Sequence, residues 1–215
     1  MLIDFGWEHF EPLIRGAELT LFLCAISGVI ASIVGVILGV ARTSPSRIAR
    51  GVSGVYINFI RGQPILIILF FMYFVLPLIL PSATFSRALT AIVGLSVYGA
   101  AYIGEIFRGS VAAIPKGQRE AAEALGMHYF IRSWYVILPQ AMKIAVPSWF
   151  GFLISLIKAS SLVSVIGYVE LTRAGRIVST INQEPLTTFL IVAVFYFIIS
   201  YPLSLLGRWY ERRLA

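Results

Sequence analysis

The chain has 215 residues, of which 59% are hydrophobic and only 13% charged, and its mean hydropathy is +0.88. This composition excludes an ordinary soluble domain, whose surface needs more polar groups, and predicts an integral membrane protein. We attribute the net charge of +7 to arginines in the loops, so we expect no nucleic-acid partner. A single cysteine, Cys24, excludes an intrachain disulfide, and two histidines, His9 and His128, provide no metal cluster.

Residues 1–18 form a mixed, partly acidic N-terminal segment. We expect it to lie along the outer membrane interface, with Phe5, Trp7 and Phe10 as aromatic anchors. It lacks the basic start of a signal peptide, so no cleaved leader is predicted.

Residues 19–41 carry no charge and are long enough to cross a bilayer. Small residues recur on one face of this expected helix: Gly28, Ser32, Gly35 and Gly39. Such a face allows a second helix to approach closely in lipid. The alternative is a chance recurrence in a glycine-rich membrane protein.

A basic turn at residues 42–50 leads into a second apolar run, residues 53–80. This run is longer than a straight span needs, which implies a tilt or a break. We expect the break at Arg61-Gly62-Gln63-Pro64, because Pro64 lacks a backbone donor and disfavours helix at the residue before it.

The third, fourth and fifth spans are expected at residues 88–107, 134–157 and 185–207, and residues 208–215 form a short tail. Residues 160–167 are hydrophobic but too short to span, so they predict a re-entrant or surface segment.

A polar stretch, residues 115–139, separates the third and fourth spans. Residues 117–126 favour a helix, with Arg119 and Glu123 spaced as a surface pair and Gly126 as its stop. Ten residues give about 15 Å, half of what a bilayer core needs, so this helix must lie at the membrane surface. A soluble partner could grip it there; the alternative is an ordinary amphipathic loop helix.

Five spans place the two termini on opposite sides of the membrane. With the N-terminus outside, ten basic residues lie in the inner segments and five in the outer ones. This bias predicts an outer N-terminus, a cytoplasmic C-terminus and a cytoplasmic helix at 117–126. The chain has no phosphate-binding Gly-x-x-x-x-Gly-Lys-Ser/Thr loop, no His-Glu-x-x-His and no serine elbow, so we do not expect an enzyme.

The strongest motif lies in the polar stretch. The tripeptide Glu120-Ala121-Ala122 is followed four positions after Ala122 by Gly126, and later by Leu138-Pro139. This pattern resembles the EAA loop of ATP-binding-cassette importer permeases, with Val136 where the family usually has isoleucine. Further blocks over residues 59–64, 101–109, 138–141 and 158–162 look like the polar amino acid branch of that family (histidine, glutamate, glutamine, arginine and opine permeases).

The resemblance covers about residues 16–207. It implies an all-α membrane protein of the bacterial cytoplasmic membrane, with five transmembrane helices in the type I importer fold over residues 19–207 and a cytoplasmic coupling helix at 117–126. It also implies a second permease subunit, identical or related, a cytoplasmic ATPase dimer that grips the EAA helices, and an extracytoplasmic amino acid binding protein. ATP and Mg²⁺ would then be bound by the ATPase, and no cofactor by this chain.

Candidates for the substrate pathway are Arg61, Gln63, Tyr98, Tyr102, Glu105, Ser160 and Ser161. Ionisable groups near membrane spans usually face an interior or a cavity. The alternatives are structural. Glu105 could pair with Arg108, Arg61 could reach the interface, and the serines could bond their own backbone.

Besides Val136 and small changes at Gly104 and Ser110, two departures from the family pattern bear on function. Ala159 stands where the branch often has a polar residue, so we carry over no substrate contact there, and Arg119 replaces a usual aromatic. Two other functions stay open: a secondary carrier driven by an ion gradient alone, and a membrane protein that only docks a partner. The EAA block favours the permease over both.

Overall fold

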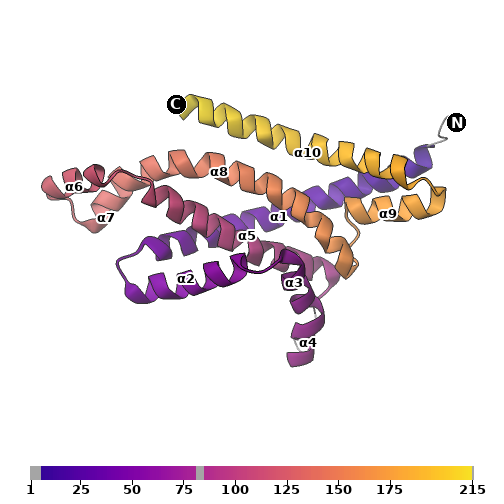
Figure 1. Cartoon of the computed structure of the whole chain (residues 1–215), viewed down its shortest axis with the longest axis horizontal. Helices are drawn as coiled ribbons and strands as arrows, with labels where there is room; N and C mark the ends of the chain where they lie inside the picture. The colour runs from indigo at the N-terminus through magenta and orange to yellow at the C-terminus, as the bar shows by residue number, and fades with distance from the viewer. Residues whose placement is uncertain (1–5, 81–84, 215) are drawn as a thin grey trace.

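The computed structural model describes residues 6–80 and 85–214, and within those ranges the chain is helical with no strand (Figure 1). The elements are α1 (Trp7–Thr43), α2 (Arg47–Arg61), α3 (Ile65–Phe70), η1 (Phe71–Val75), α4 (Leu76–Ile79), α5 (Arg87–Ala112), α6 (Lys116–Ala124), α7 (Tyr129–Arg132), η2 (Ser133–Ile137), α8 (Leu138–Ala159), η3 (Ser160–Ile166), α9 (Leu171–Asn182) and α10 (Pro185–Leu214). Four helical segments of the described chain are long and apolar enough to cross a membrane, or five if the bent pair α2 and α3–α4 counts as one.

The N-terminal segment is not a separate interfacial element. From Trp7 onward it is the first part of α1, and Leu13 and Ala17 are buried against Leu171 and Ala174 of α9. The helix therefore begins well before the predicted span at residues 19–41, because the charged residues at its start do not interrupt it. Of the three expected aromatic anchors, Trp7 is exposed and Phe5 lies outside the described residues.

The small-residue face of α1 packs directly on α5 and α8, as expected. A Cβ on Gly35 would lie 2.7 Å from Cβ of Ile103, and one on Gly39 would lie 2.7 Å from Cβ of Phe107. Ser32 accepts a 2.9 Å hydrogen bond from the indole of Trp149 on α8. The close approach of these three helices forms the core of the molecule.

The second apolar run breaks where the proline predicted it would. Helix α2 ends at Arg61, α3 begins at Ile65, and the two directions differ by 102°. In Figure 1, α2 lies along the body, whereas α3 and α4 project away from it. The run is therefore a bent pair and not a tilted straight span.

The other helices are longer than expected. Helix α5 continues beyond residue 107 to Ala112, and α10 continues through the predicted tail to Leu214. The fourth span lies within a continuous helical segment, Tyr129–Ile166, because the chain re-enters a helix soon after Gly126. The polar residues at these ends are part of the helices, so a change from apolar to polar sequence does not mark a helix end.

A proline follows each of the two π-helical turns, two residues after the last residue of the turn. In η2 the N–H of Leu138 bonds the carbonyl of Ser133, five residues back, and Pro139 follows. In η1 the N–H of Leu76 bonds Phe71 in the same way, and Pro77 follows. Proline has no N–H for the i→i−4 hydrogen bond, and its ring clashes with the carbonyl four residues back. The wider π-helical turn makes room for the ring.

The segment between the fourth and fifth spans is short and largely packed against the protein. Residues Ser160–Ile166 form a 3₁₀ helix that ends at Gly167, whose φ of 86° suits glycine. Helix α9 follows and lies beside the N-terminal end of α1 and beside α10.

Candidate functional site

Helix α6 is short and ends in a defined turn. Gly126 has φ +75°, its N–H bonds Glu123 O at 2.9 Å, and the N–H of Met127 bonds Ala122 O at 3.0 Å. This pair of bonds is a Schellman motif, in which glycine supplies the left-handed residue. Gly126 thus stops the helix, as predicted. Nine residues give about 14 Å, too short to cross a bilayer.

The two faces of α6 differ. Ala122 is 3% exposed and packs against the protein, whereas Glu120 and Ala121 are exposed. Leu125, at the end of the helix, is 77% exposed, which is unusual for a large apolar side chain. In the Glu120-Ala121-Ala122 motif, Glu120 and Ala121 therefore face outward, and Ala122 packs against the protein.

Three polar contacts tie α6 to the membrane helices. Glu123 forms an ion pair with Arg132 of α7. The guanidinium of Arg119 donates a 2.8 Å hydrogen bond to Val111 O at the end of α5, and Gln140 of α8 donates to Gln118 at 3.2 Å. The expected Arg119–Glu123 pair is not formed, because each side chain finds a partner on a neighbouring helix.

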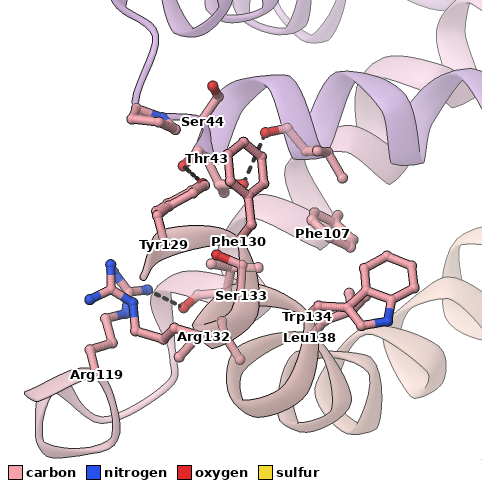
Figure 2. A pocket seen from close by; sticks show the side chains of 14 residues that line it. Thr43, Ser44, Phe107, Arg119, Tyr129, Phe130, Arg132, Ser133, Trp134 and Leu138 are labelled. Carbon is pink, nitrogen blue, oxygen red and sulfur yellow. Dashed lines mark hydrogen bonds between the residues drawn. The ribbon is translucent and has the colours of Figure 1, made fainter. Parts of the chain in front are cut away.

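A cavity of about 410 Å³ lies beside α6, between the ends of α1 and α5 and the α7–η2 segment. Figure 2 shows Phe107 and Trp134 on its walls, with Arg119 and Arg132 at one edge. The hydroxyl of Tyr129 donates a 3.1 Å hydrogen bond to Thr43 O, which joins α7 to the end of α1.

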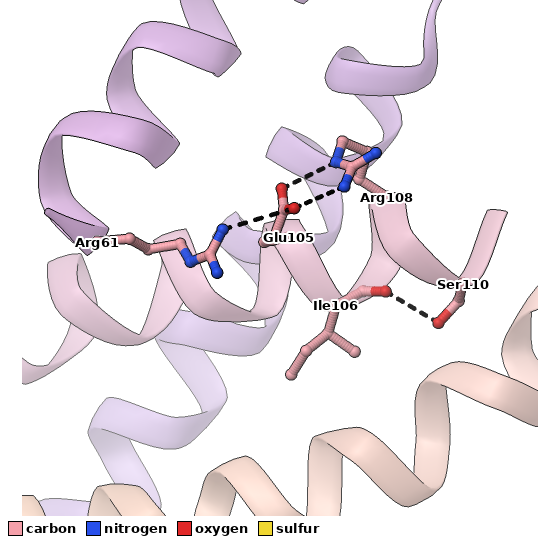
Figure 3. Close-up of polar contacts among 5 residues, drawn as sticks. All are labelled: Arg61, Glu105, Ile106, Arg108 and Ser110. Carbon is pink, nitrogen blue, oxygen red and sulfur yellow. Dashed lines mark hydrogen bonds and ion pairs between the residues drawn. The ribbon is translucent and has the colours of Figure 1, made fainter. Parts of the chain in front are cut away.

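The charged pathway candidates gather in one ionic cluster. Glu105 accepts two hydrogen bonds from Arg108, at 2.9 and 2.6 Å, and lies 3.5 Å from the guanidinium of Arg61 (Figure 3). The arrangement brings together α2 and α5, since Arg61 and Glu105 are more than 40 residues apart in the chain. One carboxylate thus sits between two guanidinium groups, which leaves the cluster with a net positive charge.

An aromatic stack adjoins this cluster. The guanidinium of Arg61 lies 5.4 Å from the ring centroid of Tyr102, which lies 4.6 Å from that of Tyr98. Tyr102 also stacks on Phe152 of α8, at 5.5 Å. Phe152 was not among the predicted residues, since a lone phenylalanine in an apolar run carries no distinguishing signal. Together these side chains offer cationic, anionic and aromatic surfaces in one place.

The remaining candidates lie elsewhere. Gln63 sits at the bend, where its backbone N–H bonds Ile60 O. Ser160 is fully buried and its hydroxyl donates to Ile157 O, while Ser161 donates to Lys158 O, each at 2.7 Å. No polar contact among the described residues joins these three side chains to the ionic cluster.

Sequence reasoning missed Glu170, a fully buried carboxylate at the start of α9. It accepts hydrogen bonds from the N–H groups of Thr172 and Arg173 and from the hydroxyl of Tyr196, each at 2.8 Å. Burial raises the pKa of Glu170, and these hydrogen bonds oppose part of the rise. Only its place before the helix could have signalled a cap, and glutamate is not a usual cap residue.

No group of three or more metal-ligating side chains occurs in the part of the chain that the structure describes. The site therefore consists of a small exposed helix tied to membrane helices, and of an ionic and aromatic cluster between α2, α5 and α8. These features are those of a multi-pass membrane protein that carries one short exposed helix between its spans.

A family model described as the inner-membrane component of binding-protein-dependent transport systems matches residues 31–215. The chain belongs to this family and is a multi-pass inner-membrane protein.

Relatives and solved structures agree with this assignment. The chain is 38% identical to the glutamine transport system permease protein GlnP of Escherichia coli K12, over 99% of both chains. It is 37% identical to the probable amino-acid ABC transporter permease protein YckA of Bacillus subtilis, over 89% of this chain and 84% of that one. A crystal structure of an amino acid ABC transporter with histidines matches with a TM-score of 0.89 at 30% identity, covering 96% of this chain and 95% of the other. An inward-facing structure of the MetNI methionine ABC transporter matches with a TM-score of 0.78 at 26% identity, over 98% of this chain and 99% of the other.

Proposed function

We propose that this chain is the membrane-spanning permease subunit of an ATP-driven importer of polar amino acids. The observation that carries the proposal is α6: a nine-residue helix that cannot span, seated by Ala122 and presenting Glu120 and Ala121 outward. Full-length similarity to amino acid permeases supports the substrate class.

In this proposal two permease subunits, identical or related, enclose the pathway, and a cytoplasmic ATPase dimer grips the two α6 helices. An extracytoplasmic binding protein delivers the amino acid. ATP and Mg²⁺ are bound by the ATPase, and this chain supplies no cofactor site. Closure of the ATPase dimer draws the α6 helices together, and the membrane helices tied to them change from inward-open to outward-open.

The contacts of α6 support this transmission of force. Its ion pair with Arg132 leads into α8, its bond to Val111 leads into α5, and α7 is bonded to α1 through Tyr129. A displacement of α6 therefore acts on three membrane helices at once. Glu120, in the middle of the exposed face of α6, is the carboxylate we assign to the ATPase contact.

We place the N-terminus outside and the C-terminus and α6 in the cytoplasm. The support is the two-to-one excess of basic residues in the segments on the α6 side of the membrane. We assign Arg61, Tyr98, Tyr102 and Glu105 to the pathway wall, because ion pairs and aromatic faces suit a zwitterionic amino acid that leaves water. Gln63, Ser160 and Ser161 stay secondary candidates.

Reconstitution tests the proposal. The chain is placed in proteoliposomes with its ATPase and binding protein, and uptake of labelled glutamine, glutamate, histidine and arginine is measured with and without ATP. We expect uptake only when all components and ATP are present, and loss of ATPase association when Glu120 is replaced by Arg. Uptake by the chain alone on an ion gradient would show a secondary carrier instead.

A further inference from the structure

The cavity beside α6 is lined by some of the residues that tie α6 to the membrane helices, but the proposed function assigns it no occupant. It occupies about 410 Å³ between α1, α5, α6 and the α7–η2 segment, on the membrane side of α6. The outward residues Glu120 and Ala121 are not among those that line it. A partner that grips the exposed face of α6 therefore leaves this cavity open.

The walls of the cavity are mostly hydrocarbon. Phe107 and Val111 come from α5, Val40 from α1, and Trp134 and Leu138 from the α7–α8 segment. Such walls favour an apolar chain and disfavour a polar amino acid, because a polar group there loses water without gaining a hydrogen-bond partner. The occupant must be largely apolar.

The edge of the same cavity is cationic. Arg119 and Arg132 both line it, as Figure 2 shows. Arg119 donates one N–H to Val111 O, and Arg132 pairs with Glu123 through one nitrogen. A guanidinium has five N–H donors, so each arginine keeps donors for an additional anion. The fork of donors matches the oxygens of a phosphate.

The cavity is continuous with an exposed apolar stripe on α1. Ile33, Ile37 and Val40 follow one another at helical spacing and are 59%, 62% and 51% exposed, and Val40 lines the cavity. Close to the cationic edge, Phe130 and Trp134 are 75% and 67% exposed, as aromatic residues at a membrane interface are. An apolar chain lying on the stripe leads directly to the cavity.

We propose that this cavity binds an anionic phospholipid, with its phosphate at Arg119 and Arg132 and an acyl chain along Val40, Ile37 and Ile33. Basic pockets between membrane helices bind acidic headgroups in this way. The inference rests on the proposed function only for the leaflet, which is the cytoplasmic one. Because both arginines also hold α6, the bound lipid would set how firmly α6 is seated.

Trp134, which lines the cavity, provides a direct probe. The purified full chain is titrated in neutral-detergent micelles with phosphatidylglycerol or phosphatidylcholine carrying brominated acyl chains, which quench nearby tryptophan. The same titration of Trp134→Phe is subtracted to isolate the Trp134 signal. We expect phosphatidylglycerol to quench that signal at a lower concentration than phosphatidylcholine.

Substitutions test which residues cause the preference for phosphatidylglycerol. Arg119→Gln and Arg132→Gln should each weaken the apparent affinity for phosphatidylglycerol about fivefold, which corresponds to about 1 kcal/mol per arginine. Ser133→Phe, which fills the cavity and leaves both arginines in place, should abolish the quenching. Arg176→Gln, an exposed arginine on α9, is the matched control and should change nothing.

Equal quenching by the two lipids, or a preference that Arg119→Gln and Arg132→Gln leave intact, would overturn the proposal. So would full competition by inorganic phosphate alone, which would indicate a site for a free anion, or protection of Trp134 from both lipids in a dimer, which would indicate a second copy as the occupant. None of these measurements uses the ATPase, so they fail or succeed independently of the transport assay.

Discussion

Glu123 of α6 pairs with Arg132 of α7 across the turn that Gly126 begins, so the exposed helix is fastened to the segment that continues into α8. The side chain of Glu123 is 60% exposed and that of Arg132 is 16% exposed. An ion pair with one solvated partner contributes little to global stability, at most about 1 kcal/mol. Its effect is local: it keeps α6 at a fixed angle to the membrane helices.

We expect Glu123→Gln to loosen α6 without lowering the melting temperature of the protein. Amide hydrogen exchange over residues 116–126 should rise severalfold, because local opening no longer breaks an ion pair. Glu120→Gln, a change on the exposed face, is the control and should leave exchange unchanged. Unaltered exchange in Glu123→Gln would mean that the pair does not hold the helix.

Gly126→Asp should leave the protein in the membrane but uncouple ATP hydrolysis from uptake. The Cβ meets nothing within 4 Å, so the change acts through the φ of +75°, where an L-residue costs about 1 kcal/mol and shifts the turn. Membrane content, ATPase rate and uptake of the reconstituted complex are measured together. Gly51→Asp, an exposed glycine with open space around it and no unusual φ, is the control. Normal ATP-driven uptake by Gly126→Asp would contradict this role.

Gly35→Ala should destabilise the protein by about 1–3 kcal/mol, because its Cβ would lie 2.7 Å from Ile103 and 3.0 Å from Ala100 O, and the α1–α5 contact must open. Thermal unfolding in detergent measures the change. Gly109→Ala on α5, where nothing lies within 4 Å, should be neutral or slightly stabilising. Equal melting temperatures for the two variants would refute the close packing.

Double-mutant cycles should rank the two contacts of Glu105. The coupling free energy between Glu105 and Arg108 should exceed that between Glu105 and Arg61, because Arg108 makes two hydrogen bonds whereas Arg61 lies 3.5 Å away. All three side chains are partly exposed, so we expect the Arg61 coupling to stay below about 1 kcal/mol. Glutamine variants, singly and in pairs, supply both cycles from chemical unfolding. A larger coupling free energy between Glu105 and Arg61 than between Glu105 and Arg108 would show that Arg108 is not the main partner.

Glu170→Ala should lower stability by about 2 kcal/mol, because the N–H groups of Thr172 and Arg173 lose the acceptor that caps α9. Unfolding in detergent measures this, and Glu184→Ala, an exposed glutamate before α10, is the control. Burial also raises the pKa of Glu170 above its ordinary value of 4.5. The stability that this shift contributes is complete below about pH 4.5 and is lost as pH rises through the raised value. The difference between wild type and Glu170→Gln should therefore shrink over that window; a difference that grows with pH would show a lowered pKa.

The parts of the fold that depend on local chemistry were predictable. The break before Pro64, the stop at Gly126 and the packing face at Gly35 each follow from what one residue type can do with its backbone. The helix ends were less accurate, since charge shows where lipid ends and not where a helix does.

The tertiary partners could not be predicted in the same way. Arg119 was expected to pair with Glu123 at helical spacing, but it bonds Val111 O instead, because α5 ends beside it. The meeting of Arg61 with Glu105 depends on how α2 folds back on α5, which periodicity does not encode. The cap at Glu170 was missed because glutamate is not a usual cap residue, and its third donor, Tyr196, lies on a separate helix.

Helix α1 is an unbroken rod of 37 residues, about 55 Å long, whereas the hydrocarbon layer is about 30 Å thick. Even a strong tilt leaves one or both of its ends outside the lipid. One end is packed on α9 through Leu13, and the other is bonded to Tyr129. Helix α1 thus connects the two membrane surfaces as one continuous helix, so a displacement of one end moves the other end as well.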